Sequence, residues 1–370
     1  MTGPAGHGSA AGSLRGASVR ALEPMHTVRA AQVVRAADVD LESPGRRDYL
    51  VALPHDSIWG DHLIPLTVLV GASAQPGRGL AAFGATHGDE YEGPIALAHL
   101  RREIDPADVL GRIILVPVLN RPAFAAGARS SVLDDRVNLN RAFVAAAGQD
   151  PSLAGITHRI ADFVRSLIFP MVDVVIDLHA GGDVAEFAPC ASFHPIDDPD
   201  QGRRIEETAR WFGTPLLVTY QNATPGLLTS EAERLGKVTI GAELGWGRSA
   251  RPAGVSAARH GVLAAAIHHG YLRGSIEPIG HHASGTQRLV SIVDPAGTIA
   301  APFGGHYESL VACGEDVRRG TVVGLLHDFD RLDLAPVPLE AGVDGVLVAQ
   351  AWAAPVVQGQ HIVVVGRVIG

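Results

Sequence analysis

Short apolar runs alternate with stretches of helical periodicity between residues 50 and 271. The apolar runs predict strands at residues 66–70, 80–85, 112–118, 172–178, 216–219 and 238–242. The helical stretches are residues 95–103, 156–168, 203–212 and 256–269. Strands that alternate with helices along a chain form a mainly parallel or mixed sheet with helices on both faces. We therefore expect an α/β fold whose functional residues lie at the carboxyl ends of the strands.

The pattern changes beyond residue 280 to short Val-rich strands, frequent glycines and no helical periodicity. GEDVRRGTVVGLL at 314–326 is loosely repeated by PVVQGQHIVVVG at 355–366, and both resemble half-motifs of lipoyl or biotinyl carrier domains. Such carriers need a lysine at a hairpin tip, and residues 238–370 contain none. We expect residues 281–370 to form a small all-β barrel-sandwich domain that caps the site and carries no cofactor.

Composition and charge narrow the classes of partner and location. Residues 1–20 are rich in Gly, Ala and Ser and predict a disordered leader, which leaves residues 21–280 for the catalytic domain. The net charge of −9 argues against a nucleic-acid partner. Cys190 and Cys313 are too few for a disulfide framework, so we expect a cytoplasmic protein. The longest span without charged residues, 345–366, is interrupted by Pro, Gln and Gly, so no membrane span is expected.

A candidate metal site follows the second predicted strand. The segment GATHGDEYEGP places His87 and Glu90 three residues apart between an apolar run and a predicted helix. A catalytic zinc ion takes three nitrogen or oxygen ligands and leaves one position open. His179, at the end of the run VVIDLH, is the third candidate ligand. Asp177 shares its strand face and can fix the tautomer of a ligand histidine through a hydrogen bond.

HGDE, NLNR and DLH occur in this order and resemble the motifs of the succinylglutamate desuccinylase/aspartoacylase family. These proteins are zinc hydrolases related to carboxypeptidase A, and family members also possess a C-terminal β domain. The resemblance covers about residues 45–275. Three stretches are closest to the branch of N-acetyl-diaminobutyrate deacetylases of ectoine breakdown: DSIWGDHLIPLTV (56–68), GDEYEGPIAL (88–97) and LNRPAF (119–124).

The resemblance implies a zinc centre with one ion per subunit. His87, Glu90 and His179 match the zinc ligands of the family. Glu243, in the segment GAELG, matches the general base. Zinc lowers the pKa of a bound water towards about 7. The carboxylate then takes a proton from the water and returns it to the leaving amine.

The resemblance also implies which residues hold the substrate. Arg129 follows Asn120 by the same spacing as the arginine that polarises the scissile carbonyl in the family. Asn140 and Arg141 match the pair that holds the substrate carboxylate. Arginine suits this task because it can donate two parallel hydrogen bonds to one carboxylate.

Two features depart from the family pattern. Asn138 stands where the family has an aspartate two residues before the Asn-Arg pair. Residues 220–233 contain no Arg or Lys, whereas aspartoacylases use basic groups here to hold a side-chain carboxylate. A neutral or cationic amino acid therefore fits better than an acidic one. Glu231 and Glu233 could face a cationic side chain, although a solvated helix face explains them equally well.

These observations predict a zinc-dependent amidohydrolase that removes an acyl group, most readily acetyl, from an N-acyl amino acid such as N-acetyl-diaminobutyrate. Two alternatives use the same chemistry: an aspartoacylase-type deacylase of N-succinyl or N-acetyl amino acids, and a small-peptide metallocarboxypeptidase. A non-enzymatic metal-binding protein is the alternative from another class, although every expected ligand and base position is filled. The expected partners are a small N-acyl amino acid and, by family resemblance, a second copy in a homodimer.

Overall fold

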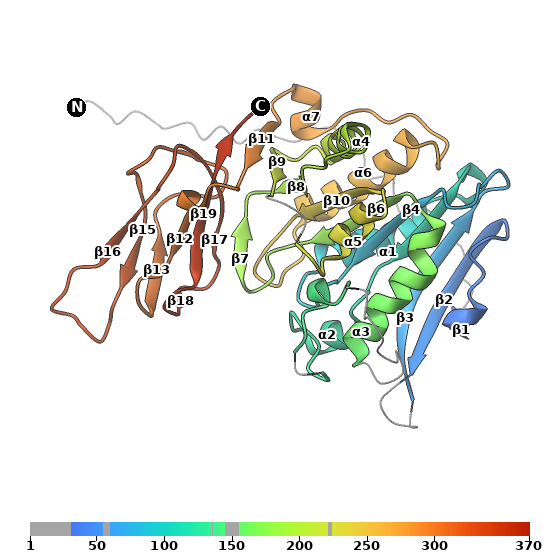
Figure 1. Ribbon diagram of the computed structural model, residues 1–370, viewed down its shortest axis with the longest axis horizontal. Helices are drawn as coiled ribbons and strands as arrows, with labels where there is room; N and C mark the ends of the chain where they lie inside the picture. The colour runs from blue at the N-terminus through green and yellow to red at the C-terminus, as the bar shows by residue number, and fades with distance from the viewer. Residues whose placement is uncertain (1–30, 55–59, 135, 145–154, 221–223) are drawn as a thin grey trace, which may run out of the picture. The chain divides into compact units, whose positions relative to one another are not determined.

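The computed structural model describes residues 31–370, apart from residues 55–59, 135, 145–154 and 221–223 (Figure 1). Within these residues, one mixed sheet runs in the order β1-β2-β3-β5-β4-β6-β10-β8-β9-β11-β19-β17-β14, with β12 beside β19 and β7 beside β17. Its strands up to residue 291 are β1 (Gln32–Arg35), β2 (Gly45–Pro54), β3 (Asp61–Val70), β4 (Leu80–Gly84), β5 (Arg112–Val116), β6 (Val174–His179), β7 (Ala185–Phe187), β8 (Cys190–Phe193), β9 (Leu216–Thr219), β10 (Val238–Glu243) and β11 (Arg288–Ser291).

Parallel pairs join β5, β4, β6 and β10 at the centre of the sheet. On either side, β3 pairs with β5 and β8 pairs with β10 in the antiparallel sense. Because β4, β6 and β10 run in one direction, their carboxyl ends meet at the same edge of the sheet. The loops that follow β4 and β6 therefore lie close to the end of β10.

Helices pack on both faces of this sheet. The α-helices are α1 (Glu92–Glu103), α2 (Arg121–Ala126), α3 (Ile156–Phe163), α4 (Pro199–Arg210), α5 (Leu228–Arg234), α6 (Pro252–His268) and α7 (Gly280–Ser284). Shorter 3-10 turns are η1 (Ala36–Asp38), η2 (Pro106–Asp108), η3 (Leu139–Arg141), η6 (Phe169–Met171) and η7 (Pro295–Gly297), and a π-helical turn, η5 (Val164–Ile168), continues α3.

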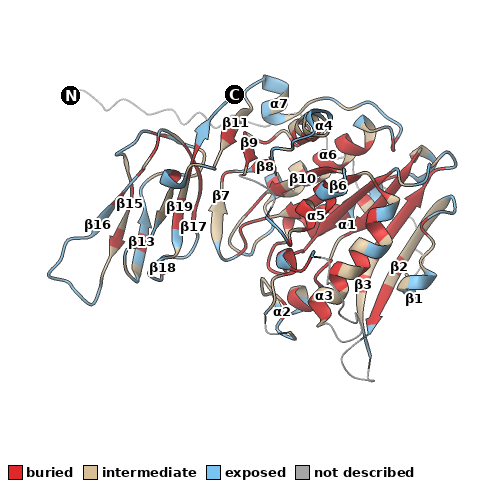
Figure 2. Cartoon of the chain, in the orientation of Figure 1, coloured by how far each residue is buried: buried red, intermediate tan, exposed pale blue. Residues whose placement is uncertain are grey.

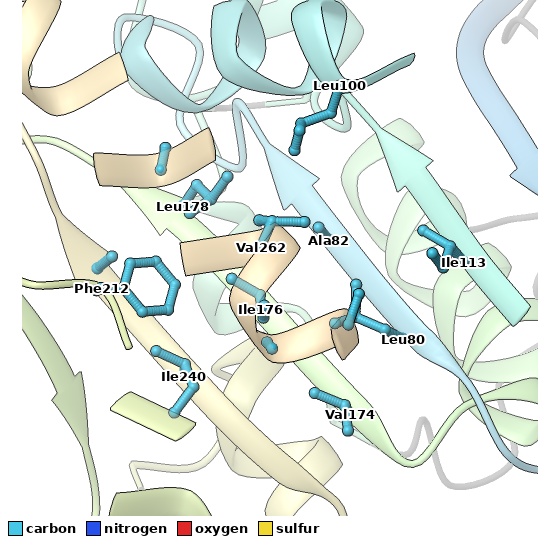
Figure 3. Close-up of a cluster of buried hydrophobic side chains, with 14 of the residues drawn as sticks. Leu80, Ala82, Leu100, Ile113, Val174, Ile176, Leu178, Phe212, Ile240 and Val262 are labelled. Carbon is cyan, nitrogen blue, oxygen red and sulfur yellow. The ribbon is translucent and has the colours of Figure 1, made fainter. Parts of the chain in front are cut away.

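Alternate side chains of the central strands enter two different hydrophobic clusters, because successive residues of a strand point to opposite faces. Leu80, Ala82 and Ile176 pack with α1, α4 and α6, which contribute Leu100 and Val262 among others (Figure 3). The intervening residues of the same strands pack with α3 and α5. The central strands are buried along their length (Figure 2), and each large apolar side chain contributes about 1.5–3 kcal/mol. The prediction of a mixed α/β fold is confirmed.

The C-terminal residues form short strands, some in the large sheet and some in a second sheet. They are β12 (Thr298–Ala300), β13 (Gly305–Ser309), β14 (Asp316–Val317), β15 (Val322–His327), β16 (Val337–Glu340), β17 (Gly345–Ala351), β18 (Pro355–Val356) and β19 (His361–Val368). Within the described part of the chain, the second sheet has four strands in the order β16-β15-β13-β18. Side chains from both sheets meet in one hydrophobic cluster, which includes Val323, Leu347 and Val363.

The loose sequence repeat corresponds to a repeated backbone unit. In the first copy β14 is followed by a turn and β15, and in the second β18 is followed by a turn and β19. Gly320 and Gly359 occupy matching places in the two turns, with left-handed φ angles of 82° and 81°. Glycine adopts this backbone conformation at no steric cost, which explains why both copies contain it.

The predicted boundary between residues 280 and 281 falls at α7, and the large sheet continues beyond it through β11, which pairs with β9 and β19. The division into a catalytic and a C-terminal domain stays a prediction. The predicted leader, residues 1–20, lies outside the described residues. None of the helices in the described ranges is long and apolar enough to cross a membrane.

Candidate active site and metal centre

The loop after β4 carries His87 and Glu90 at the edge of the sheet, and several contacts fix its path. Ala85 turns the chain with a left-handed φ of 52°, and Asn120 donates a hydrogen bond from its side chain to the carbonyl of Thr86. Gly88 packs so closely against α2 that a Cβ would lie 2.1 Å from the carbonyl carbon of Ala123. This close approach leaves the loop little room to move.

The three predicted metal ligands meet at this edge of the sheet. Glu90 lies between the two histidines, with Oε1 2.8 Å from His87 Nδ1 and Oε2 2.8 Å from His179 Nδ1. One nitrogen or oxygen atom from each residue lies within 4.8 Å of the others. Two imidazole nitrogens and a carboxylate form the donor set expected for a catalytic zinc site with an open fourth position.

The outer nitrogen of each histidine is bonded to an oxygen, which leaves Nδ1 free to ligate. His179 Nε2 lies 2.8 Å from Asp177 Oδ2, and His87 Nε2 lies 3.1 Å from Asn138 Oδ1. Thr86 Oγ1 in turn donates to Asp177 Oδ1 at 2.6 Å. Because an oxygen acceptor draws the ring proton to Nε2, the lone pairs of both Nδ1 atoms point toward Glu90. These residues therefore fit a divalent metal ion.

The charges around the cluster also favour a cation. Burial lowers the pKa of His87, which keeps this imidazole neutral and able to ligate. Burial acts in the same direction on His179, but the carboxylates of Asp177 and Glu90 outweigh it and hold the pKa of His179 well above its ordinary value. Burial raises the pKa of Glu90, yet both histidines overcome this and lower it. The site thus attracts positive charge, whether a proton or a metal ion.

Replacing Asp177 with asparagine is expected to weaken zinc binding by about 10- to 100-fold, because the variant loses the charge that orients His179 and increases its basicity. Competition with a chromophoric chelator measures this affinity. Asp183→Asn is the matched control, since its exposed carboxylate lies near Arg248, outside the cluster. Equal zinc affinities for Asp177→Asn and the unchanged protein would contradict the assigned contact.

Glu243 and Arg129 flank the metal cluster. Glu243 ends β10 and pairs in register with His179 at the end of β6. Burial raises the pKa of Glu243 to about 8, and its Oε2 atom is buried without a hydrogen-bond partner among the described residues. Arg129 Nη1 donates to Glu90 Oε1 at 3.1 Å. A partly buried carboxylate and a guanidinium therefore lie beside the cluster, each able to act on a molecule bound there.

Asn140 and Arg141 lie in η3, next to the same cluster. Asn140 Oδ1 accepts a hydrogen bond from the Leu228 amide at the start of α5, and Nδ2 lies 3.1 Å from His179 Nε2. Because the Nε2 proton is already donated to Asp177, the Asn140 amide keeps its hydrogens for another acceptor. Arg141 is exposed, and both residues line the cavity that holds the predicted ligands.

That cavity has a volume of about 520 Å³ and includes His87, His179 and Glu243 in its lining. Side chains of β17 and β19, from the C-terminal part of the chain, line it as well. The sequence motifs did not predict His194, which also lines the cavity. A correct assignment of residues 190–193 as a strand beside β10 could have identified it. Glu233 lies in the cavity lining, whereas Glu231 pairs with arginines elsewhere.

The fold and the site define a metallohydrolase-like protein, and comparison with known proteins gives its family. Residues 76–269 match the succinylglutamate desuccinylase/aspartoacylase catalytic domain. The chain belongs to this family, as the order of its motifs predicted.

Individual relatives are similar along most of the chain. It is 35% identical over 340 residues to the N-alpha-acetyl-L-2,4-diaminobutyric acid deacetylase of Halomonas elongata, covering 90% of this chain and 95% of that protein. The product-bound ectoine utilization protein EutE (DoeB) of Ruegeria pomeroyi superposes with a TM-score of 0.80 at 31% identity, covering 89% of this chain and 98% of that one. A succinylglutamate desuccinylase/aspartoacylase from Rhodobacter sphaeroides gives a TM-score of 0.82 at 30% identity, with 90% and 98% covered.

Proposed function

We propose that this chain is a zinc-dependent deacylase that removes the acetyl group from Nα-acetyl-L-2,4-diaminobutyrate or a close analogue. The observation that carries the proposal is the cluster of His87, Glu90 and His179 with Glu243 beside it in register. The similarity to a named deacetylase over nearly the whole chain supports the substrate class. Zinc held by such ligands supplies an acidified water and polarises the acyl carbonyl.

The chain's own residues divide the remaining work. Glu243 accepts a proton from the water that attacks the acyl carbon. As the carbon–nitrogen bond breaks, the same proton goes to the amine nitrogen, so that acetate and the free amino acid leave. Arg129 stabilises the negative charge on the carbonyl oxygen. Asn140 and Arg141 hold the α-carboxylate.

The walls of the cavity support a small substrate over a peptide. Strands β17 and β19 line the cavity on one side, which agrees with a capping role for the C-terminal barrel-sandwich domain. A capped cavity of about 520 Å³ accommodates an acyl amino acid but limits the length of a peptide. A cytoplasmic location and a homodimer remain predictions of the sequence.

Replacing Arg129 with alanine is expected to lower kcat by about 10²–10³-fold, because an oxyanion donor acts mainly in the transition state. Steady-state kinetics with the acetylated substrate measure the effect. Arg121→Ala is the matched control, because this nearby arginine is exposed and does not line the cavity. A similar loss in both variants would show that general basic charge, rather than the position of Arg129, matters.

Hydrolysis of a panel of compounds tests the proposed function. Mass spectrometry follows the zinc-loaded protein with N-acetyl, N-succinyl and N-formyl derivatives of diaminobutyrate, ornithine, aspartate, glutamate and neutral amino acids, together with tripeptides. We expect acetate release from the cationic or neutral amino acids. Turnover of N-succinylglutamate or N-acetylaspartate alone would agree with the proposed amide hydrolysis but would contradict the proposed substrate. Preferential cleavage of tripeptides would favour a carboxypeptidase.

A further inference from the structure

The cavity extends from Glu243 along one face of β10. Thr239 and Gly241 share this face with Glu243, because alternate residues of a strand point to the same side. Gly241 has no side chain, and Ser192 Oγ on β8 lies so close that a Cβ on Gly241 would be only 2.6 Å from it. Gly241 and Glu243 therefore form this floor of the cavity, and Thr239, two positions before Gly241, is fully buried beneath its end.

A buried histidine–carboxylate pair lies near the Thr239 end of this floor. His194, directly after β8, has Nδ1 3.0 Å and 2.9 Å from the two carboxylate oxygens of Glu233. Thr239 Oγ1 donates to Glu233 Oε1 at 2.7 Å. His194 is 5% exposed and Glu233 6% exposed, and both line the cavity. This cluster of His194, Glu233 and Thr239 is separate from the metal ligands.

The cluster has an unused acceptor that faces the cavity. Because His194 donates its Nδ1 proton to Glu233, its Nε2 atom carries a lone pair in the neutral imidazole. Within the described ranges, no side chain or backbone group bonds to that Nε2 atom. The ring of Tyr220 packs beside His194, with 5.6 Å between ring centroids. An aromatic ring and a free ring nitrogen thus border the same part of the cavity.

Apart from His194, no basic side chain in the described ranges pairs with the Glu233 carboxylate. Among the described residues, its carboxylate bonds only to His194 and Thr239. Glu231, two positions earlier in α5, forms ion pairs with Arg165 and Arg234. A buried carboxylate is costly unless a positive charge compensates it. A cationic ligand group in the cavity would supply that charge.

We infer that His194 and Glu233 form the subsite for a primary ammonium group on the substrate side chain. The ammonium donates a hydrogen bond to His194 Nε2, and the Glu233 charge behind the ring strengthens this bond. The inference rests on the proposed function, since it places the acyl group at the metal cluster. It makes His194 and Glu233 determinants of specificity for a diamino acid.

The test compares two substrates of the same shape. Nα-acetylnorvaline carries a methyl group where Nα-acetyl-2,4-diaminobutyrate carries an ammonium. We expect the unchanged protein to prefer the diaminobutyrate compound in kcat/KM, and Glu233→Gln to reduce the ratio of the two values by about 10- to 100-fold. Glu231→Gln is the matched control and should keep the ratio. No preference in the unchanged protein, or an unchanged ratio in Glu233→Gln, would overturn the inference.

Calorimetric binding of free diaminobutyrate and norvaline separates this inference from the proposed function. Preferential diaminobutyrate binding that Glu233→Gln removes would support the subsite even if the protein hydrolysed no acyl amino acid. Equal hydrolysis of both acetylated compounds by the unchanged protein would leave the deacylase function intact and reject the subsite. Circular dichroism and zinc content confirm that the variant is folded and metal-loaded.

Discussion

Replacing Glu243 with glutamine is expected to lower kcat by about 10²–10⁴-fold, the contribution that a general acid–base group typically makes. Glutamine has nearly the same shape but cannot accept a proton from water or return it to the amine. Since Glu243 is not one of the three clustered ligands, the zinc content should stay unchanged. Steady-state kinetics and elemental analysis of the same preparation measure both quantities.

Glu103→Gln provides the control for this prediction, because Glu103 is a partly exposed residue of α1 that pairs with Arg259. It should leave kcat and zinc content unchanged. Full activity in Glu243→Gln would reject the proposed proton transfer. Loss of zinc together with activity would instead show that Glu243 supports the metal site.

Replacing His179 with alanine is expected to abolish both zinc binding and hydrolysis. The variant keeps His87 and Glu90, but two protein ligands hold zinc far more weakly than three. It also removes the imidazole that donates a hydrogen bond to Asp177. Elemental analysis after gel filtration should find about one zinc ion per chain in the unchanged protein and almost none in the variant.

His99→Ala is the matched control for the loss of the ligand, because His99 is exposed on α1 and outside the cluster. We expect it to retain both zinc and activity. A His179→Ala protein that kept its zinc would show that the metal binds elsewhere. If the variant kept its zinc but lost its activity, His179 would act in the reaction without being a zinc ligand.

The sequence predicted the buried centre of the fold better than its margins. Apolar runs identified the strands in which almost every residue is buried, and β9 has the predicted bounds, Leu216–Thr219. The pattern did not predict β8, Cys190–Phe193, since this strand is short and Ser192 interrupts its apolar run. Nor could a local pattern show that β8 runs antiparallel to β10, because that direction depends on the path of the whole chain.

The metal ligands were predictable because each lies in a short motif at a strand end. The His194–Glu233 pair was not, because its members are 39 residues apart and neither stands in a motif. Residues two apart on a helix point in nearly opposite directions, so the sequence could not show which of Glu231 and Glu233 faces the cavity. The sequence shows that Asn138 replaces the aspartate of the family, but only the structure shows that Asn138 contacts His87 Nε2.

The central claim is that the cluster of His87, Glu90 and His179 supports metal-dependent deacylation. Its most direct test is acetate release from Nα-acetyl-2,4-diaminobutyrate, followed by proton NMR in one preparation before metal removal, after chelation and after addition of stoichiometric zinc. We expect release before chelation, none in the metal-free protein and recovery on zinc addition. Undiminished release by the metal-free protein, or none from any N-acyl amino acid by the zinc-loaded protein, would contradict the claim.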